Sequence, residues 1–296
     1  MNRKTTGILY GSIGAVCYGT NPLFALHMYG NGYGANSVLF YRYFTAVIIF
    51  GLWSKFIKKV SLKIEVKEIL PLCIAALMFS LSSLALFHSY SYIDGGIASV
   101  ILFIYPIFVA IIMTLFFKEK NSLSTILSIL LVSFGVFLLY KGKNGQNLNL
   151  TGLFLVVISA ISYAIYMILI KKNNILNKMK SEKLTFYIML FGLSVFIYNL
   201  NFLQSLQAVS SPILWFDILM LAILPTIVAI DTLNISIKMI GPTLSAIVSA
   251  LEPVSAMIFC VVFFHEEITI KIFFGIIAIL SAVFIVVLNK SPKGNN

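Results

Sequence analysis

The chain consists mostly of apolar runs that are separated by short polar segments. Ten of these runs have roughly 17–25 residues, the length that an α-helix needs to cross about 30 Å of hydrocarbon. The pattern therefore predicts an all-α integral membrane protein with ten transmembrane helices. Their approximate ranges are 7–28, 37–57, 69–90, 95–117, 122–140, 151–170, 184–203, 216–238, 243–264 and 270–289.

The composition agrees with a protein that spans the membrane several times. Of its 296 residues, 60% are hydrophobic and only 10% are charged, and the mean hydropathy is +1.00. Soluble domains have about 45–50% apolar and about 25% charged residues. The first apolar run follows the basic segment MNRKTT, as in a signal peptide, but its full length and the runs behind it favour an uncleaved first helix.

The basic residues predict the orientation in the membrane. If the N-terminus is cytoplasmic and the spans alternate, all but four of the 21 Lys and Arg residues fall on the cytoplasmic side or at its boundary, the exceptions being Arg42, Lys141, Lys143 and Lys271. By the positive-inside rule, both termini then lie in the cytoplasm. The membrane is expected to be a bacterial cytoplasmic membrane. The net charge of +11 is therefore interpreted as a topology signal, and no nucleic-acid partner is expected.

The two halves of the chain repeat one another. FIYPIFVAIIMTLFFKEK (103–120) aligns with ALEPVSAMIFCVVFFHEE (250–267), which pairs Pro106 with Pro253. Other pairs keep the same order with nearly the same separation: Gly7 with Gly152, Tyr18 with Tyr163, and Phe40 with Phe186. We predict two five-helix domains, 1–143 and 144–296, joined through KGKNGQNLNL (141–150).

Five spans are an odd number, so the second copy is expected to enter the membrane from the opposite side. Two inverted repeats are the architecture of secondary transporters, whose binding sites lie near the midplane between the repeats. A structural membrane protein without transport activity is the alternative.

Several motifs together resemble one known family. An arginine early in the second span (LFYRYF) and the segments YPIFVAIIMTLFFKEK and LEPVSAMIFCVVFFHEEIT are similar to the drug/metabolite transporter superfamily, EamA-like family. The resemblance covers essentially the whole chain, although Gly135 corresponds to Ala282 and Ser128 replaces a usual glycine. It implies a carrier of small polar metabolites, often an exporter of amino acids.

Three ionisable residues lie clearly inside predicted spans, away from the span ends, where each needs a partner or water: Arg42, Asp231 and Glu252. They are candidate substrate-binding residues, and the two acids, at comparable predicted depth, are expected to share a proton or hold a cation. The alternatives are an Arg42 side chain that extends to the membrane surface, an Asp231 that belongs to a cytoplasmic vestibule, and a structural Glu252.

Pro106 and Pro253 occupy equivalent mid-span positions and are candidate gating residues. A proline removes a helical hydrogen bond, so we expect unpaired carbonyl groups near Leu102 and Ser249 and a bend at the repeat interface. The freed backbone is tolerated in a membrane where it lines protein or water. A conformationally silent kink is the alternative.

Polar and aromatic residues on the first spans of each half complete the candidate substrate site. Tyr18, Asn21, Tyr105, Tyr163 and Tyr166 are predicted to face it, although tyrosines also form belts at membrane interfaces. In contrast, Ser80, Ser82 and Ser83 are interpreted as helix-packing residues, and the Gly7–Gly11 pair as the seat of a neighbouring helix.

No enzyme, cofactor or metal site is predicted. The sequence has no GxSxG, HExxH or nucleotide-binding motif, the three cysteines are scattered, and the three histidines lie at predicted span ends. Glu119 and Glu266 end their spans beside other polar residues and are interpreted as structural. With no soluble domain attached, energy must come from an ion gradient, including protons, an exchange partner or the substrate's own gradient.

The predicted function is alternating-access transport of amino acids or related small metabolites, and the family resemblance implies that the direction is export. An arginine toward one side and acids deeper in the membrane suit a zwitterion. The competing hypotheses are an organic-cation or drug carrier, which would use acids and aromatic faces alone, and a channel or structural membrane protein.

Overall fold

The computed structural model describes residues 2–93, 95–119, 123–139, 149–264 and 270–288, and in these ranges the regular elements are all helices. Most of the predicted linker between the halves (141–148), Glu266 with its neighbours and the basic C-terminal residues lie outside the described residues. The first half contains α1 (Arg3–Tyr18), α2 (Asn21–Gly30), α3 (Ala35–Leu52), the π-helix η1 (Trp53–Ile57), α4 (Val66–Ser89), α5 (Gly95–Leu102), α6 (Tyr105–Phe117) and α7 (Leu123–Leu139).

The second half contains α8 (Leu150–Lys172), α9 (Asn174–Lys178), α10 (Ser181–Asn199), α11 (Pro212–Ala222), the π-helix η2 (Ile223–Val228), α12 (Ala229–Ile240), α13 (Pro242–Val248), α14 (Leu251–Phe264) and α15 (Ile270–Leu288). Within the described ranges, five continuous helical segments are long and apolar enough to cross a membrane: Ala35–Ile57, Val66–Ser89, Leu150–Lys172, Ser181–Asn199 and Pro212–Ile240. The protein is therefore a multi-pass membrane protein, whereas the count of ten spans stays a prediction.

Three of the predicted spans are each made of two consecutive helices. The first divides into α1 and α2 at Gly19, the fourth into α5 and α6 at Phe103, and the ninth into α13 and α14 at Ala250. The breaks at Phe103 and Ala250 occupy equivalent positions of the two repeats. Pro106 and Pro253 therefore lie beside breaks between two helices, and not at bends within one continuous helix.

The prolines lie just after these breaks, in the first turn of the next helix. A helix leaves its first N–H groups without intrahelical partners, so a proline in this turn removes no hydrogen bond. The carbonyl oxygen of Ser249 accepts a hydrogen bond from the backbone N–H of Glu252 at 2.9 Å. The expectation that Pro253 leaves the Ser249 carbonyl unpaired is therefore wrong.

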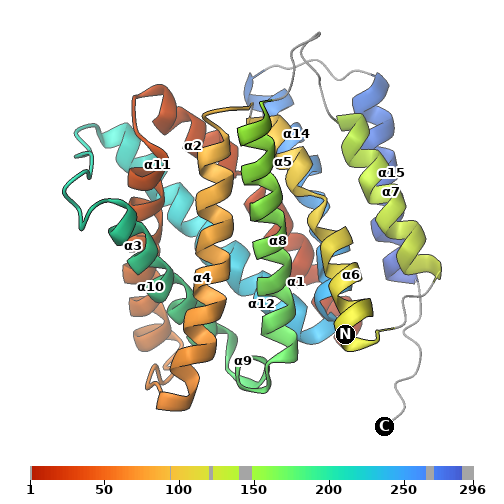
Figure 1. Ribbon diagram of the computed structural model, residues 1–296, viewed down its shortest axis with the longest axis horizontal. Coiled ribbons are helices and arrows are strands. Elements are labelled where there is room, and N and C mark those ends of the chain that lie inside the picture. Colours follow the sequence, from red (N-terminus) through yellow and green to blue (C-terminus); the bar gives the residue numbers. More distant parts are fainter. Residues whose placement is uncertain (1, 94, 120–122, 140–148, 265–269, 289–296) are drawn as a thin grey trace.

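The main helix contacts follow the sequence repeat. Helix α1 packs along α12, and α4 packs along α8, which is the equivalent pair in the repeat. Two further contacts, α3 with α10 and α7 with α15, each join an element to its own repeat counterpart, whereas α6 contacts α13, the counterpart of α5. Figure 1 shows α7 and α15 side by side at one edge of the bundle.

Small residues allow the closest of these contacts. A Cβ atom at Gly7 would lie 2.6 Å from the Ile240 side chain, and one at Gly11 would lie 2.8 Å from Ser236 Oγ. The predicted role of this glycine pair in seating a neighbouring helix is confirmed, and the neighbour is α12. The exterior carries many exposed apolar side chains, such as Leu52, Phe134 and Phe274, as expected for a surface that faces lipid.

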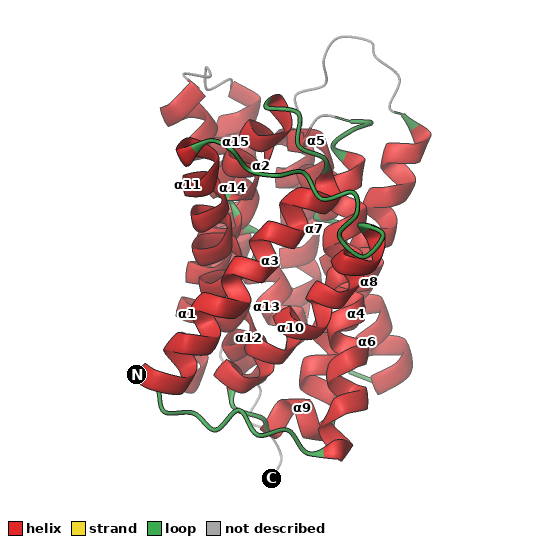
Figure 2. Cartoon of the chain, turned by 90° about the vertical axis from the view of Figure 1, so that its left-hand side faces the viewer, coloured by secondary structure: helices red, strands yellow, loops and turns green. Residues whose placement is uncertain are grey.

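The helices run roughly along one common axis, and the N-terminal end of α1 lies at the same end of the bundle as α9 (Figure 2). The predicted topology places both at the cytoplasmic surface. We use this end of the bundle, which also contains the start of α4, as a reference and call it the α9 end.

Candidate functional site

A cavity of about 30 Å³ lies between the two repeats. Such a volume holds a few water molecules at most, so the site is nearly closed in this conformation. On α4 its lining residues run from Phe79 to Phe87, in the half of the helix away from the α9 end, and Tyr90 follows directly after the helix. The complete lining is Tyr18, Asn21, Pro22, Arg42, Phe79, Ser82, Ser83, Leu86, Phe87, Tyr90, Ser99, Leu102, Tyr163 and Glu252.

Arg42 contributes its guanidinium group to the cavity wall. Its side chain is buried, with the residue 1% exposed, so the hypothesis that it extends to the membrane surface is wrong. Arg42 donates from Nε to Thr226 Oγ1 at 2.5 Å, from Nη1 to Asn21 Oδ1 at 3.1 Å and from Nη2 to the Pro225 carbonyl oxygen at 2.9 Å. The ring of Phe87 lies 5.6 Å from its guanidinium carbon. All three acceptors are neutral, so no acidic side chain among the described residues hydrogen-bonds to Arg42, although its charge acts on Glu252 through space.

The acceptors for Arg42 arise from the local sequence Leu–Pro–Thr in the π-helix η2. Pro225 has no backbone N–H, so it cannot donate to the carbonyl of Leu221 four residues earlier. The Thr226 hydroxyl donates to this carbonyl instead, at 2.7 Å, and its oxygen accepts from Arg42. The sequence alone did not identify Pro225 or Thr226 as part of the site.

The contact with Arg42 also fixes the orientation of Asn21. A guanidinium group has donors only, so the Asn21 atom that faces it must be the amide oxygen. The amide NH₂ group of Asn21, another lining residue, then points away from Arg42. Arg42 and Asn21 therefore form a donor pair in the cavity wall, the arrangement that recognises a carboxylate or another anion.

Glu252 lies in the first turn of α14 and contributes the acidic side chain of the cavity. Among the described residues, no hydrogen bond or close ion pair reaches its carboxylate, and the charge of Arg42 acts on it only through space. The start of a helix is the positive end of its dipole, which favours a carboxylate there. A Cβ atom at Gly19 would lie 2.9 Å from the carbonyl oxygen of Glu252, so the glycine lets the α1–α2 break approach α14.

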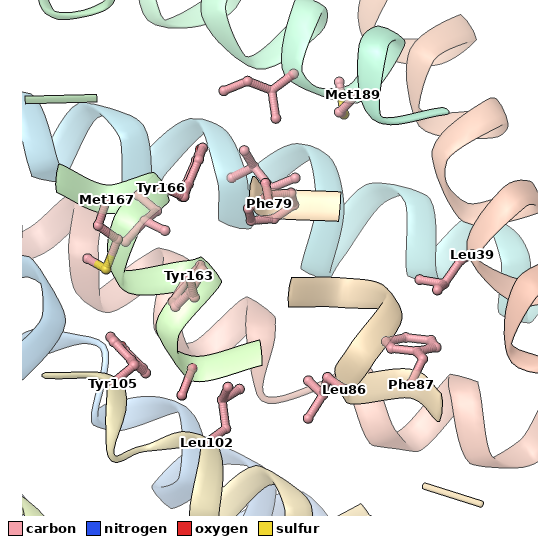
Figure 3. Close-up of a cluster of buried hydrophobic side chains, with 14 of the residues drawn as sticks. Leu39, Phe79, Leu86, Phe87, Leu102, Tyr105, Tyr163, Tyr166, Met167 and Met189 are labelled. Atoms are coloured by element: carbon pink, nitrogen blue, oxygen red, sulfur yellow. The ribbon is translucent and has the colours of Figure 1, made fainter. Parts of the chain in front are cut away.

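Four aromatic rings form a layer between the cavity and the α9 end. Tyr163 contacts Tyr105 edge-on, with ring centroids 4.9 Å apart, and lies parallel to Tyr166 at 6.1 Å. Phe79 lies 4.8 Å from the Tyr166 ring. Figure 3 shows these residues together within the buried core. Phe79 and Tyr163 line the cavity, whereas Tyr105 and Tyr166 do not.

Asp231 belongs to a separate hydrogen-bond network below this layer. The Tyr166 hydroxyl donates to Asn234 Oδ1 at 2.6 Å, the Asn234 amide donates to Thr185 Oγ1 at 3.0 Å, and the Thr185 hydroxyl donates to Asp231 Oδ1 at 3.1 Å. Each donor points along the chain toward the Asp231 carboxylate. Asp231 does not line the cavity, so the structure does not bring it together with Glu252 as a carboxylate pair.

The cavity thus unites Tyr18, Asn21, Arg42, Tyr163 and Glu252 from the predicted set, and leaves out Tyr105, Tyr166 and Asp231. The prediction for Ser82 needs correction: Ser82 does join α4 to α8 through Ser159 Oγ at 3.0 Å, but Ser82 and Ser83 also line the cavity. The sequence contained a usable signal, because Phe79, Ser82, Ser83, Leu86 and Tyr90 recur at helical spacings of three and four residues.

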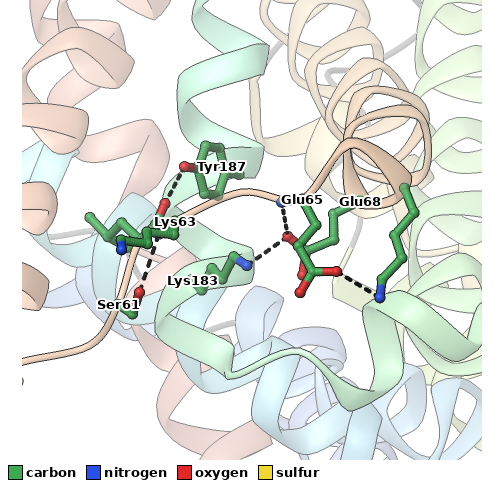
Figure 4. A network of polar contacts seen from close by, with 8 residues as sticks. Ser61, Lys63, Glu65, Glu68, Lys183 and Tyr187 are labelled. Atoms are coloured by element: carbon green, nitrogen blue, oxygen red, sulfur yellow. Dashed lines mark hydrogen bonds and ion pairs between the residues drawn. The ribbon is translucent and has the colours of Figure 1, made fainter.

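Polar contacts between the repeats close both ends of the bundle. At the α9 end, Lys183 Nζ lies 2.7 Å from Glu68 Oε2, and the Tyr187 hydroxyl donates to the Leu62 carbonyl oxygen (Figure 4). At the opposite end, His27 Nδ1 lies 2.6 Å from Asp217 Oδ2. Asp217 is 5% exposed, a buried acid that the sequence analysis did not consider.

The described residues contain no group of three or more His, Cys, Asp or Glu side chains that would hold a metal ion. The side chains that line the cavity supply hydrogen-bond donors, one carboxylate, hydroxyl groups and aromatic rings. This combination suits the reversible binding of a small polar molecule.

Comparisons with known proteins agree with the fold and the repeat. A family model described as the EamA-like transporter family matches twice, at residues 5–141 and 150–288. The chain is 23% identical over 278 residues to YcbK of Bacillus subtilis (strain 168), an uncharacterised transporter, covering 90% of this chain and 88% of the relative. An uncharacterised transporter of Archaeoglobus fulgidus is 33% identical over 75 residues, or 25% of this chain and 26% of the relative.

A solved crystal structure superimposes on the model with a TM-score of 0.80 at 15% sequence identity. The match covers 96% of this chain and 97% of the other. At this identity the likeness concerns the fold alone.

Proposed function

Because the chain belongs to the EamA-like transporter family, we propose that it carries amino acids or closely related small metabolites across the bacterial cytoplasmic membrane, in the direction of export. Two inverted five-helix repeats move relative to each other in alternating access, with both termini in the cytoplasm. Because the family and the relative are described as transporters, we propose transport without a catalytic reaction.

One observation carries the proposal: a single cavity contains the Arg42–Asn21 donor pair and a Glu252 carboxylate that has no hydrogen-bond donor among the described residues. A buried charge is costly unless it is paired. A zwitterion offers a carboxylate to the donor pair and an ammonium group to Glu252, so it neutralises both charges at once. Neither an anion nor a cation alone does so.

The small volume of the cavity fits a closed step of the transport cycle. About 30 Å³ is too small for an amino acid, so the helices must separate before the substrate enters. The aromatic layer and the Lys183–Glu68 ion pair lie on the α9 side. We propose that these contacts close the cytoplasmic path, and that their release opens it.

Transport by reconstituted protein tests the proposal directly. Purified protein in liposomes loaded with an unlabelled amino acid should take up the labelled amino acid by counterflow, with saturation at high concentration. Quaternary amines without a carboxylate serve as the comparison. Saturable amino-acid counterflow supports the proposal, uptake of the amines alone rejects it, and uptake that never saturates favours a channel.

The organic-cation carrier is the second candidate, and one feature favours it. Phe79, Phe87, Tyr90 and Tyr163 surround the cavity that contains Glu252, and aromatic faces attract cations. Arg42 argues against a cation as the sole substrate, because its own positive charge lies in the same wall.

Coupling to protons or to an exchanged substrate is proposed at Glu252. Binding of an ammonium group favours the ionised carboxylate, whereas burial in an empty cavity favours the protonated one. Alternation between the two forms would link substrate movement to proton movement. Counterflow at several pH values, with and without a proton gradient, distinguishes proton coupling from simple exchange.

A further inference from the structure

We propose that Thr226 is a positioning residue that holds the guanidinium group of Arg42 in place to receive the carboxylate of the substrate. This inference rests on the proposed function and adds a residue outside the cavity lining. Thr226 contacts no substrate in this arrangement and acts only through Arg42.

Thr226 completes two hydrogen bonds that depend on each other. Its hydroxyl proton is directed to the Leu221 carbonyl oxygen at 2.7 Å, which leaves a lone pair of the same oxygen for Arg42 Nε at 2.5 Å. Thr226 is fully buried, with 0% exposure, so water is not at hand to replace it. The neighbouring Pro225 cannot supply the missing donor to Leu221, because it has no N–H.

The position of the Thr226 bond on Arg42 explains why it determines orientation. Nε lies at the base of the guanidinium plane, and Nη2 is held at the Pro225 carbonyl on the same edge. Two bonds on one edge fix the rotation of this planar group. The opposite edge then carries the remaining Nη1 and Nη2 protons and the bond to Asn21.

Loss of the Thr226 hydroxyl should weaken recognition of one end of the substrate only. The guanidinium group would lose an acceptor at Nε and rotate toward other oxygen atoms, which also releases Asn21. Glu252 lies on α14, has no bond to Thr226, and would still meet an ammonium group. The effect should therefore depend on whether the substrate carries a carboxylate.

The experiment compares Thr226→Val with Thr226→Ser in reconstituted protein. Valine keeps the shape of threonine and removes the hydroxyl, whereas serine keeps the hydroxyl. Thr232→Val is the matched control, because Thr232 lies on α12 and its hydroxyl donates only to backbone carbonyls of its own helical segment, such as Val228 at 2.7 Å. For each variant, KM and maximal rate are measured for an amino acid, and binding is measured for the amine that lacks its carboxylate.

We expect Thr226→Val to raise the KM for the amino acid about tenfold, as the loss of a hydrogen bond to a charged group implies. Its affinity for the amine should change less than about twofold. Thr226→Ser should restore the wild-type KM, and Thr232→Val should leave it unchanged. Should Thr226→Val be poorly folded, Thr226→Cys supplies a similar volume with a weak acceptor and should show the same selective loss.

An equal loss for the amino acid and the amine would overturn the positioning role, because it would indicate general damage to the cavity. An unchanged KM in folded Thr226→Val protein would overturn it as well. If wild-type protein transports no amino acid at all, the proposed function fails first, and this outcome is recognised before any Thr226 variant is compared.

Discussion

Glu252 and Asp231, two acids inside predicted spans of the second repeat, lie in contrasting environments. Glu252 faces the cavity without a hydrogen-bond partner among the described residues, whereas Asp231 accepts from Thr185 at the end of a chain that begins at Tyr166. Both residues looked equivalent as carboxylates inside apolar runs. Their surroundings differ: the Glu252 carboxylate is available to a ligand, whereas the Asp231 carboxylate is hydrogen-bonded within the protein.

The contrast teaches that a buried charge is informative about binding only when its partners are known. A carboxylate with bonded donors stabilises the fold around it. One without them is costly unless a ligand, water or a proton completes it. Arg42 lies between these two cases, because it makes three hydrogen bonds but all three acceptors are neutral. The following predictions test the contrast, from the largest expected effect to the smallest.

Arg42→Lys should have the largest effect. Lysine keeps the charge but cannot reach Thr226, Pro225 and Asn21 with one planar group. We expect kcat/KM for amino acids to fall on the order of 100-fold, the loss expected from removing charge-assisted hydrogen bonds. Initial rates of counterflow measure it, with Arg3→Lys at the start of α1 as the control. Near wild-type transport by Arg42→Lys would show that a simple positive charge suffices.

Glu252→Gln should retain folding and lose most net transport. Glutamine keeps the shape and hydrogen-bonding capacity of the side chain but removes its titration. Net transport should fall roughly tenfold or more, in keeping with the loss of a paired charge, and the pH dependence of the residual exchange should change. Glu65→Gln, at an exposed position, is the control. Wild-type rate with an unchanged pH profile in folded protein would make Glu252 a structural acid and Asp231 the better candidate.

Asp231→Asn should act on stability more than on substrate affinity. The amide oxygen of asparagine still accepts from Thr185, but the bond loses its charge. We expect a loss of about 1–2 kcal/mol in the free energy of unfolding and a KM within about twofold of wild type. Thermal unfolding and counterflow on the same preparation provide the two values. A large increase in KM without a loss of stability would place Asp231 in the substrate site after all.

Pro253→Ala should have the smallest effect on binding and act mainly on the rate. Alanine supplies an N–H group that can bond to the Ser249 carbonyl, which now accepts from Glu252 N, and so favours one continuous helix from α13 into α14. The turnover rate should fall roughly threefold, and KM should stay within about twofold of the wild-type value. Pro212→Ala, at the start of α11, is the control for proline replacement in a first turn. A changed KM at constant turnover would assign Pro253 to binding instead.

Much of the architecture was predictable from the sequence, because its signals are local. Apolar runs of sufficient length predict helices that cross a membrane, and the matched prolines predict the repeat. The resemblance to the EamA-like family is confirmed by a family model that matches both halves. Arg42 and Glu252 were identifiable because a charge in an apolar run is rare wherever the helix packs.

Only the tertiary structure decided which of the candidate residues meet. Tyr105 and Tyr166 lie beside Tyr163 yet outside the cavity lining, and the spacing of these residues along their helices does not decide which of them lines it. Thr226 and Arg42 are separated by 184 positions in the sequence, and no local pattern relates them. Helical periodicity fixes the face on which a residue lies, but the partner of that face depends on how α3 packs against η2. For this reason the charged residues of the site could be identified from the sequence, whereas their hydrogen-bond partners could not.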